Sequence, residues 1–542
     1  MKKIVKLTAF AVIAALSLNS CIEETFPEGG TVTGSQAAAS STALEAMVNA
    51  IPVAMVKVQA YDSTGSYHFD FGYPSLMMIY DNMSFNAISV CGDGNAGYNW
   101  FVYFCNGGGL GPDYSRTAYI WVSYFNFIKA ANDVIYTITS ADEIPTTSMS
   151  YLAAAKAYRA MLYLDLARLY DPLENDYLDI SSVAELTLPY ISESTTEDEA
   201  RFNPRMTRDE MFDKIFADLD SAEELYTTED VKVLSGTNPS LAVVYGLKAR
   251  AYLWLGGFDS SYYTDAATYA RKAIEESGCT ITSKADYCST TAGFNTPTNA
   301  WMWYLPQSAD ATSNLLNYVA WMSSEADYGY GSLVAMGIQS SNYDRISDTD
   351  FRKDLFLSGS PKYADYASVT LLDEAGFSAM FPYAGLKFRP LGGSINDYTA
   401  GNATSIPLMR VEEMYLIEAE ATAHSSAASG ASLLNSFMSE RDSSYSFSST
   451  SSEKVVEEIL FQKGIELWGE GLYLFDAKRM GLGISSGYSG TNVASDCLFN
   501  IEGVAPWWNP PFPTSEIIQN TALDGFNNPD PSEFYTMLLW EE

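Results

Sequence analysis

The sequence predicts a mainly α-helical fold: a scaffold of tetratricopeptide-like helical repeats carrying irregular, loop-rich segments and few short strands. Three observations support this. Apolar residues recur at helical spacing, as from Ala266 to Ile274, where five fall at i, i+3, i+4, i+7 and i+8. Arg159–Leu164 is similar to Arg250–Leu255, which indicates a degenerate repeat. Gly- and Asn-rich aromatic stretches without periodicity separate the helical ones.

Length and charge limit the function classes. The chain has 542 residues, of which 47% are hydrophobic and 18% charged, so it can bury a large core. Its formal net charge is −36. Because a field of that sign repels phosphate backbones, we expect no binding of nucleic acid. The charge suits neutral ligands or a cationic partner.

The first 20 residues have the pattern of a lipoprotein signal peptide. Three lysines accompany an apolar stretch, Leu7–Leu18, that is too short to span a bilayer. It ends in Leu18-Asn19-Ser20-Cys21, which is similar to the lipobox of bacterial lipoproteins, so we predict lipidation of Cys21. Glu23 and Glu24 follow, as in lipoproteins displayed outside the outer membrane. These features predict a lipid-anchored, surface-exposed protein of the cell outer membrane.

The mature chain divides into a tether and one domain. Residues 21–41 are rich in Gly, Ser, Thr and Ala without periodicity, which is typical of a flexible tether. We expect a single domain over residues 42–542. Within it we place helical repeats at about 119–277 and 408–481, a loop-rich insert at 278–407 and a loop-rich tail at 482–542.

The expected elements follow from local patterns. Thr207 and Glu210 form a capping box that starts one helix. Residues 61–112 are aromatic, rich in Gly and Asn, and irregular, which predicts a long loop region. The remaining expected elements are a strand at Ala300–Leu305 and helices at Ala43–Val58, Tyr119–Ile138, Ser150–Tyr170, Leu241–Leu255, Leu408–Ala423 and Ala427–Asp442.

Ile459–Gly481 places charges inside an apolar run. Acidic and basic residues lie there among Leu, Trp, Tyr and Phe, and charges in such a setting are usually paired. No nucleophile, metal site or defined acid pair accompanies them. We therefore predict a structural role, in which Glu466 or Glu470 pairs with Arg479 or another buried base.

Sequence motifs give little support for catalysis. The two histidines, His68 and His424, lie far apart without a metal-binding motif, so we expect no metal site and no cofactor. Gly483–Gly487 matches a serine-nucleophile pattern but lacks the preceding strand and the following histidine. A carboxylate pair for glycoside hydrolysis stays open, because 67 acidic residues offer many pairs. Disulfides Cys91–Cys105 or Cys279–Cys288 are possible, as are free thiols.

Aromatic residues are the strongest signal in the composition. They make up 14% of the chain, including 37 Tyr and 10 Trp. Those on helices, such as Tyr163 and Trp254, are expected in the core. Rings in Gly- and Asn-rich loops are candidates for sugar contact, because flat rings pack on the apolar faces of sugars while Asn and Asp bind the hydroxyls. These are Trp100, Trp321, Tyr328, Tyr330, Trp507 and Trp508.

Several segments together resemble the SusD/RagB family, surface glycan-binding lipoproteins that sit on TonB-dependent transporters. Glu466–Arg479, with Glu470, Gly471, Tyr473, Asp476 and Lys478, resembles the family's C-terminal signature. Ile406–Ala421 resembles the preceding helix, and Arg159–Tyr170 and Tyr245–Leu255 resemble earlier repeat helices. Phe461–Gly464 departs from the pattern, since the family commonly has Glu-Arg-Arg just before the Glu-Leu pair.

The resemblance implies four tetratricopeptide-like helix pairs and ligand contacts in two loops. The corresponding residues here are Asp81, Tyr98, Asn99 and Trp100, then Trp321, Tyr328 and Tyr330. It also implies a function: non-catalytic binding of oligosaccharides or polysaccharides, which pass to a SusC-like TonB-dependent transporter. The alternatives are a surface glycoside hydrolase, and a peptide-binding or purely structural lid of the transporter.

Overall fold

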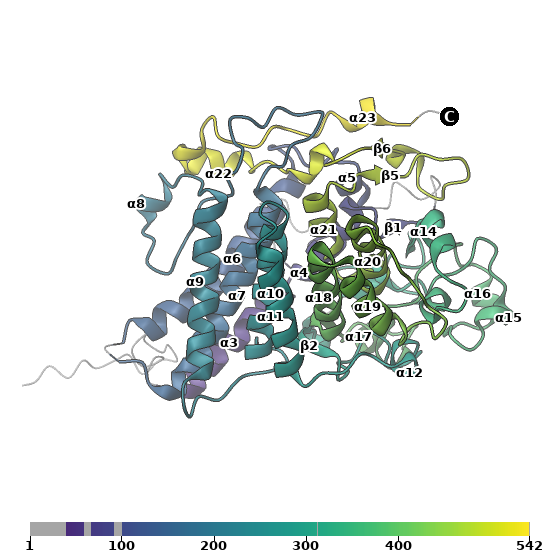
Figure 1. Cartoon of the computed structure of the whole chain (residues 1–542), viewed down its shortest axis with the longest axis horizontal. Coiled ribbons are helices and arrows are strands. Elements are labelled where there is room, and N and C mark those ends of the chain that lie inside the picture. Colours follow the sequence, from purple (N-terminus) through teal and green to yellow (C-terminus); the bar gives the residue numbers. More distant parts are fainter. Residues whose placement is uncertain (1–39, 59–66, 92–99, 142, 312, 541–542) are drawn as a thin grey trace, which may run out of the picture.

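The computed structural model describes residues 40–58, 67–91, 100–141, 143–311 and 313–540. Helices dominate this part of the chain and its strands are short, which confirms the predicted fold class (Figure 1). The signal peptide, most of the tether, Cys21, Tyr98 and Asn99 lie outside the described residues.

Long helices packed side by side form the scaffold (Figure 1). In the described part of the chain each scaffold helix packs on the next: α6 on α7, α7 on α9, α9 on α10, α10 on α11, α11 on α18, and α18 on α19 and α20, with α3 packed on α6 and α7. The insert leaves the scaffold after α11 and returns at α18. The bounds are α3 Ser41–Met55, α6 Ser115–Thr139, α7 Thr146–Tyr170, α9 Arg208–Thr227, α10 Leu241–Gly256, α11 Tyr262–Ser277, α18 Val411–Ser425, α19 Ala427–Met438 and α20 Ser452–Glu466.

The sequence repeat marks arginines that join neighbouring scaffold helices. Arg159 on α7 lies with Nε 2.7 Å from Oδ2 of Asp218 on α9. Arg250 on α10 lies with Nε 2.6 Å from Oε1 of Glu413 on α18. Both arginines are buried, so each copy of the repeat contributes a buried charged contact between helices. The capping box is also present, since Glu210 N–H donates to the Thr207 side chain and the Glu210 carboxylate accepts from Thr207 N–H.

The described residues form three two-stranded antiparallel sheets: β1 (Ile88–Ser89) with β3 (Met336–Gly337), β2 (Trp301–Pro306) with β4 (Ser405–Arg410), and β5 (Ile484–Ser485) with β6 (Asn500–Ile501). The first two join segments that are distant in the sequence. In β2–β4, Leu305 lies opposite Ile406. The helix predicted from Leu408 therefore begins only at Val411, because Leu408–Arg410 belong to β4.

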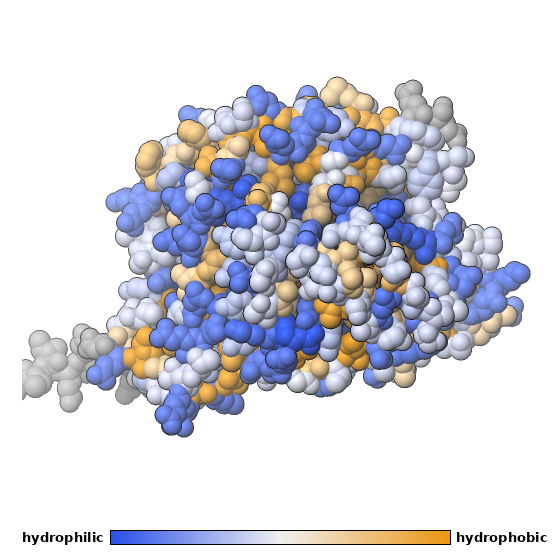
Figure 2. Space-filling view, viewed as in Figure 1, coloured by the Kyte–Doolittle hydropathy of each residue, from blue (hydrophilic) through white to orange (hydrophobic). Residues whose placement is uncertain are grey.

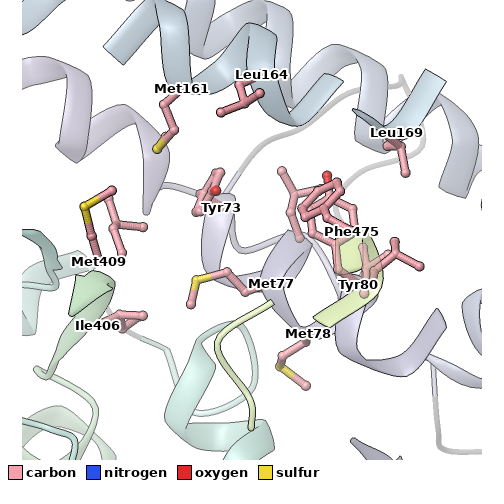
Figure 3. Packing of buried hydrophobic residues seen from close by; sticks show 14 of the residues in the cluster. Tyr73, Met77, Met78, Tyr80, Met161, Leu164, Leu169, Ile406, Met409 and Phe475 are labelled. Atoms are coloured by element: carbon pink, nitrogen blue, oxygen red, sulfur yellow. The ribbon is translucent and has the colours of Figure 1, made fainter. Parts of the chain in front are cut away.

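A helix that the sequence did not predict, α4 (Tyr73–Met83), lies at the centre of the molecule. All eleven of its residues are buried. Because a helix that is buried on every side has no polar face, it shows no helical periodicity, and its residues read as an irregular aromatic stretch. Figure 3 shows its side chains between residues of α7, β4 and α21 (Tyr473–Met480); the labelled neighbours are Met161, Leu164, Leu169, Ile406, Met409 and Phe475.

Short helices lie in the insert, in the tail and in two earlier loops. They are α5 Val102–Cys105, α8 Glu197–Ala200, α12 Lys284–Tyr287, η2 Ala309–Ala311, α13 Tyr318–Met322, α14 Ser340–Arg345, η3 Phe351–Leu355, α15 Tyr363–Tyr366, α16 Glu374–Phe377, η4 Leu391–Gly393, α17 Tyr398–Gly401, η5 Ser495–Cys497, η6 Pro506–Trp508, α22 Thr514–Gln519, η7 Thr521–Leu523 and α23 Tyr535–Leu538. None of the five described cysteines forms a disulfide, so neither of the two possible bridges, Cys91–Cys105 and Cys279–Cys288, is present among the described residues.

The surface mixes hydrophilic and apolar residues (Figure 2). Apolar side chains that reach the surface include Phe202, Ile518 and Phe526. Within the described ranges, no helix combines the length and apolar character needed to cross a membrane.

Candidate ligand-binding site

The two loops predicted to bind ligand meet in one group of rings. The ring of Trp100 lies 5.2 Å from that of His68 and 6.3 Å from that of Tyr67, centre to centre. His68 lies 5.4 Å from Tyr330, which stacks on Trp321 at 4.2 Å. We call these five residues the aromatic surface. The structure thus brings three of the predicted residues together, although Trp100 and Trp321 are far apart in the sequence.

The aromatic surface has an outer and an inner layer. Tyr67, His68 and Trp100 are half-buried, whereas Trp321 is fully buried and Tyr330 is 7% exposed. Trp321 Nε1 donates to the His68 carbonyl oxygen over 3.2 Å, and the Tyr330 hydroxyl hydrogen-bonds His68 Nδ1. Burial lowers the pKa of His68, so its ring is uncharged at neutral pH. Trp321 therefore offers no surface to a ligand, which corrects its predicted ligand contact, and the inner layer instead holds the outer rings in place.

A tight turn brings Tyr330 onto Trp321. The backbone N–H groups of Tyr330 and Gly331 both donate to the carbonyl of Ala320 on α13, each over 2.7 Å. Gly329 adopts φ +76°, and an added Cβ there would lie 2.7 Å from the Ala320 Cβ. The turn therefore needs glycine for its conformation and for space.

Other predicted aromatic residues lie elsewhere. The Tyr328 hydroxyl donates to the Ser394 carbonyl over 3.3 Å, and its ring packs edge-on against Tyr398 at 6.4 Å. Trp507 and Trp508 are fully buried, which contradicts the expectation that they contact sugar. Trp508 Nε1 donates to the Met83 carbonyl at the end of α4, over 2.8 Å. Their loop context thus reflects irregular backbone packed into the core.

Asp81 lies in the core of the protein and not at the aromatic surface. It is fully buried at the end of α4, so it offers no surface to a ligand, which corrects its predicted role. Its carboxylate accepts from Gly471 N–H over 3.1 Å and from Asn86 Nδ2 over 3.4 Å. Asp81 therefore joins α4 to the segment between α20 and α21.

Two residues of the outer layer were missed from the sequence. Tyr67 and His68 begin a run of five aromatic or histidine residues in seven positions, ending at Tyr73. This density of rings, together with one of the two histidines of the chain, could have identified the segment as part of a candidate ligand site. Among the described residues, no group of three His, Cys, Asp or Glu side chains could hold a metal ion.

The charges at the end of α20 belong to a buried network, which we call the charge centre. Glu466 accepts from Arg441 Nε over 2.9 Å and lies 3.2 Å from both Arg410 Nη1 and Arg352 Nη1. Glu470 lies 2.7 Å from Lys387 Nζ and 2.8 Å from Arg410 Nη2. The members are four cations and four carboxylates: Arg352, Lys387, Arg410, Arg441, Asp350, Glu412, Glu466 and Glu470.

The prediction that Glu466 or Glu470 pairs with a buried base is thus confirmed. The base is not Arg479. Arg479 pairs instead with Glu420 and with Asp476, the latter over 2.9 Å. Burial alone would raise the pKa of Glu466, but Arg441, Arg410 and Arg352 together hold it well below its usual range. Glu466 is therefore charged, and its role in this structure is to neutralise arginines.

Sequence comparison places the chain in a family. The profile of a SusD-like family described as "Starch-binding associating with outer membrane" matches residues 41–253, and that of the "SusD family" matches residues 381–494. The chain belongs to the SusD/RagB family. The second SusD/RagB match includes Glu466 and Glu470 of the charge centre. A search of curated proteins finds no match.

Several solved structures share this fold. A SusD-like carbohydrate binding protein from Bacteroides vulgatus ATCC 8482 is 21% identical, with a TM-score of 0.69 over 90% of this chain and 98% of that one. Surface glycan-binding protein A from Bacteroides thetaiotaomicron is 16% identical, with a TM-score of 0.63 over 90% and 98%. Its counterpart from Bacteroides fluxus is 16% identical, with a TM-score of 0.62 over 89% and 97%.

Asp81 makes the stability of this SusD/RagB chain depend on pH. Burial raises the pKa of Asp81 to about 7; the Gly471 and Asn86 hydrogen bonds and Lys387 oppose the rise, and Glu470 adds to it. Because the folded-state pKa lies above the unfolded value, the contribution of Asp81 to stability is full below about pH 4 and is lost as the pH rises through 7.

Asp81→Asn removes this titration and keeps an acceptor for Gly471 N–H. We expect the variant to gain up to about 4 kcal/mol over the wild type at pH 8, since one pKa unit corresponds to about 1.4 kcal/mol. At pH 4 we expect little difference. Urea unfolding between these pH values measures the effect. Asp133→Asn, at an exposed carboxylate paired with Lys129, is the control. Parallel pH profiles for Asp81→Asn and the wild type would contradict the prediction.

Proposed function

We propose that this chain is a glycan-binding protein that holds an oligosaccharide or polysaccharide on the aromatic surface without cleaving it. The observation that carries the proposal is the outer layer of half-buried rings, Tyr67, His68 and Trp100, backed by buried rings. Faces of this kind pack on the apolar faces of sugars, and a preformed site loses little entropy on binding. The fold shared with solved proteins named as carbohydrate- and glycan-binding supports the same ligand class.

Two carboxylates close in sequence to the aromatic surface are unsuited to hydrolysis of a bound glycan. Cleavage of a glycosidic bond commonly needs two carboxyl groups that face the ligand. Asp70, two residues after His68, is fully buried and accepts from Tyr67 N–H over 2.8 Å. Asp81 is fully buried as well.

In this proposal the protein works at the cell surface. The lipobox ending at Cys21 supports a lipid anchor in the outer membrane, and the family description associates the matched family with that membrane. The bound glycan passes from the aromatic surface to a SusC-like TonB-dependent transporter. The support for this transfer is membership of the SusD/RagB family.

Trp100→Ala tests the site. Removal of a central anchor ring from a binding surface commonly costs about 2 kcal/mol or more, so we expect at least a roughly tenfold loss of affinity. The measurement is binding to an array of soluble polysaccharides, with the full chain in a polyoxyethylene detergent, which carries no sugar. Tyr136→Ala is the control, because it removes a tyrosine on α6 that is 59% exposed.

Each alternative gives a different result. If the wild type binds no glycan on the array, the proposal is wrong; if Trp100→Ala leaves the affinity for every bound glycan unchanged, the site is wrong. Release of reducing ends from the bound glycan would favour a glycoside hydrolase. Binding of peptides but not glycans would favour the peptide-binding lid.

A further inference from the structure

A cavity of about 680 Å³ lies apart from the aromatic surface and shares no residue with it. Its wall is formed by Val90 and Cys91 next to β1, by residues of the insert, and by residues of the tail as far as Trp540. The volume lies within the range of about 300–1,000 Å³ that is typical of small-molecule sites. Segments that are distant in the sequence therefore form a space large enough for a ligand.

The chemistry of the lining is unusual for this chain. None of the described residues that line the cavity is charged, although 18% of the chain is. Three half-buried rings, Tyr383, Tyr488 and Trp540, line it, and Thr491 and Asn492 add polar groups. Another cavity, by contrast, is lined by four carboxylates: Glu174, Asp176, Asp179 and Glu502. Rings with neutral polar groups suit an uncharged ligand that has apolar faces and hydroxyls.

Tyr383 is held in an unfavourable backbone conformation. Its φ is +63°, a region that L-residues other than Asn and Asp rarely adopt. Two glycines give it room: a Cβ on Gly359 would lie 2.5 Å from the Tyr383 hydroxyl, and one on Gly337 would overlap its carbonyl. Strain that the surrounding structure maintains is concentrated at ligand sites. The position of this ring in the cavity wall is therefore a functional signal.

The opposite wall is fixed by hydrogen bonds to α14 and the residues before it. The Tyr488 hydroxyl lies 3.0 Å from Ser340 Oγ and accepts from Ser341 N–H over 3.2 Å. Asn492 Oδ1 accepts from Ser340 N–H over 2.8 Å, and its Nδ2 donates to the Ile338 carbonyl over 2.9 Å. The cavity is thus preformed, which lowers the entropic cost of binding.

We infer that this cavity is a second binding site, for a neutral saccharide, in which Tyr383, Tyr488 and Trp540 contact the sugar rings. The inference goes beyond the proposed function, because it stands on the lining of the cavity and does not require a ligand at Trp100. Cys91 lines the cavity and Trp100 belongs to the aromatic surface, and in the sequence these two residues flank residues 92–99.

Equilibrium dialysis tests the second site, with the full chain in the same detergent. The probes are short neutral gluco-, xylo-, manno- and galacto-oligosaccharides, with oligogalacturonate as the charged comparison. We expect the Trp100→Ala variant to retain its affinity for one neutral probe. The double variant, Trp100→Ala with Tyr383→Ala, should bind that probe at least about tenfold more weakly. Thr491→Trp, which fills the cavity and leaves its three rings, should give the same loss if Tyr383→Ala fails to fold. Tyr136→Ala is the matched control.

The outcomes separate the two sites. Loss of all binding in Trp100→Ala, with no effect of Tyr383→Ala or Thr491→Trp, would overturn the second site and support the first. Loss of binding in the cavity variants, with no effect of Trp100→Ala on any probe or on the polysaccharide array, would support the second site and overturn the first. Binding of oligogalacturonate in preference to the neutral probes would overturn the assigned ligand class. If the wild type binds no probe, the second site is overturned, whereas the first site is judged on the polysaccharide array.

Discussion

Glu466→Ala is expected to prevent stable folding of this protein. The carboxylate is fully buried and contacts three guanidinium groups, those of Arg352, Arg410 and Arg441. Its removal leaves an excess of buried positive charge. Loss of one partner of a buried ion pair costs about 3–5 kcal/mol, which is comparable with the whole stability of many domains, about 5–15 kcal/mol. Thermal unfolding and the yield of folded protein measure the effect.

Glu197→Ala is the matched control for this prediction. Glu197 also pairs with an arginine, Arg201, but its side chain is 79% exposed. Exposed pairs are worth about 0–1 kcal/mol, so the control should unfold like the wild type. A Glu466→Ala protein that is as stable as the wild type but has lost its glycan would show that the charge centre takes part in ligand binding.

The fold was predictable where helices carry an apolar stripe. Such stripes predicted most of the scaffold helices to within a few residues. The central helix α4 was missed, because all its residues are buried and none marks a polar face. The start of α18 was misplaced for a related reason: Leu408–Arg410 are apolar or buried whether they form a helix or pair with β2, and only the partner strand decides.

The aromatic surface was predictable in part. The chemistry of loop aromatics singled out Trp100, Trp321 and Tyr330, which do meet. The same criterion selected Trp507 and Trp508, which are buried. Loop composition indicates an irregular backbone, but exposure depends on what packs over it. In this chain the long insert and tail lie against the scaffold, so a ring in a loop is as often core as surface.

The partners of the charge centre depend on tertiary structure. The sequence indicated that Glu466 must be paired, since an unpaired buried carboxylate is costly. Arg479 was the nearby choice, but Arg352 lies 114 residues away in the sequence. The insert returns Arg352 and Lys387 to the end of α20. No local sequence pattern predicts contacts between residues that are so far apart in the chain.

Gly471→Ala is expected to destabilise the protein by about 2–5 kcal/mol. Gly471 lies between α20 and α21 at φ +72°, where a Cβ is unfavourable by about 1–2 kcal/mol. The new Cβ would also lie 2.5 Å from Met77 Cα and 3.0 Å from the Met77 carbonyl oxygen, both backbone atoms of α4. Overpacking of this kind costs about 1–3 kcal/mol more. Urea unfolding measures the sum.

Gly278→Ala separates the two contributions. Gly278 ends α11 at φ +60°, and an added Cβ there meets no atom within 4 Å. It should therefore show the conformational cost alone, about 1–2 kcal/mol. If both variants lose the same stability, close packing of α4 on this segment does not matter.

The same substitution should also weaken glycan binding, although Gly471 lies outside the aromatic surface. The segment between α20 and α21 holds both halves of that surface. Gly471 N–H donates to Asp81 on α4, which follows His68 in the chain, and the Gly469 carbonyl accepts from Tyr318 on α13, the helix that carries Trp321. Displacement of α4 relative to α13 would move His68 away from Trp321 and Tyr330. Gly471→Ala protein that remains folded should thus bind glycan more weakly, whereas folded Gly278→Ala should bind like the wild type.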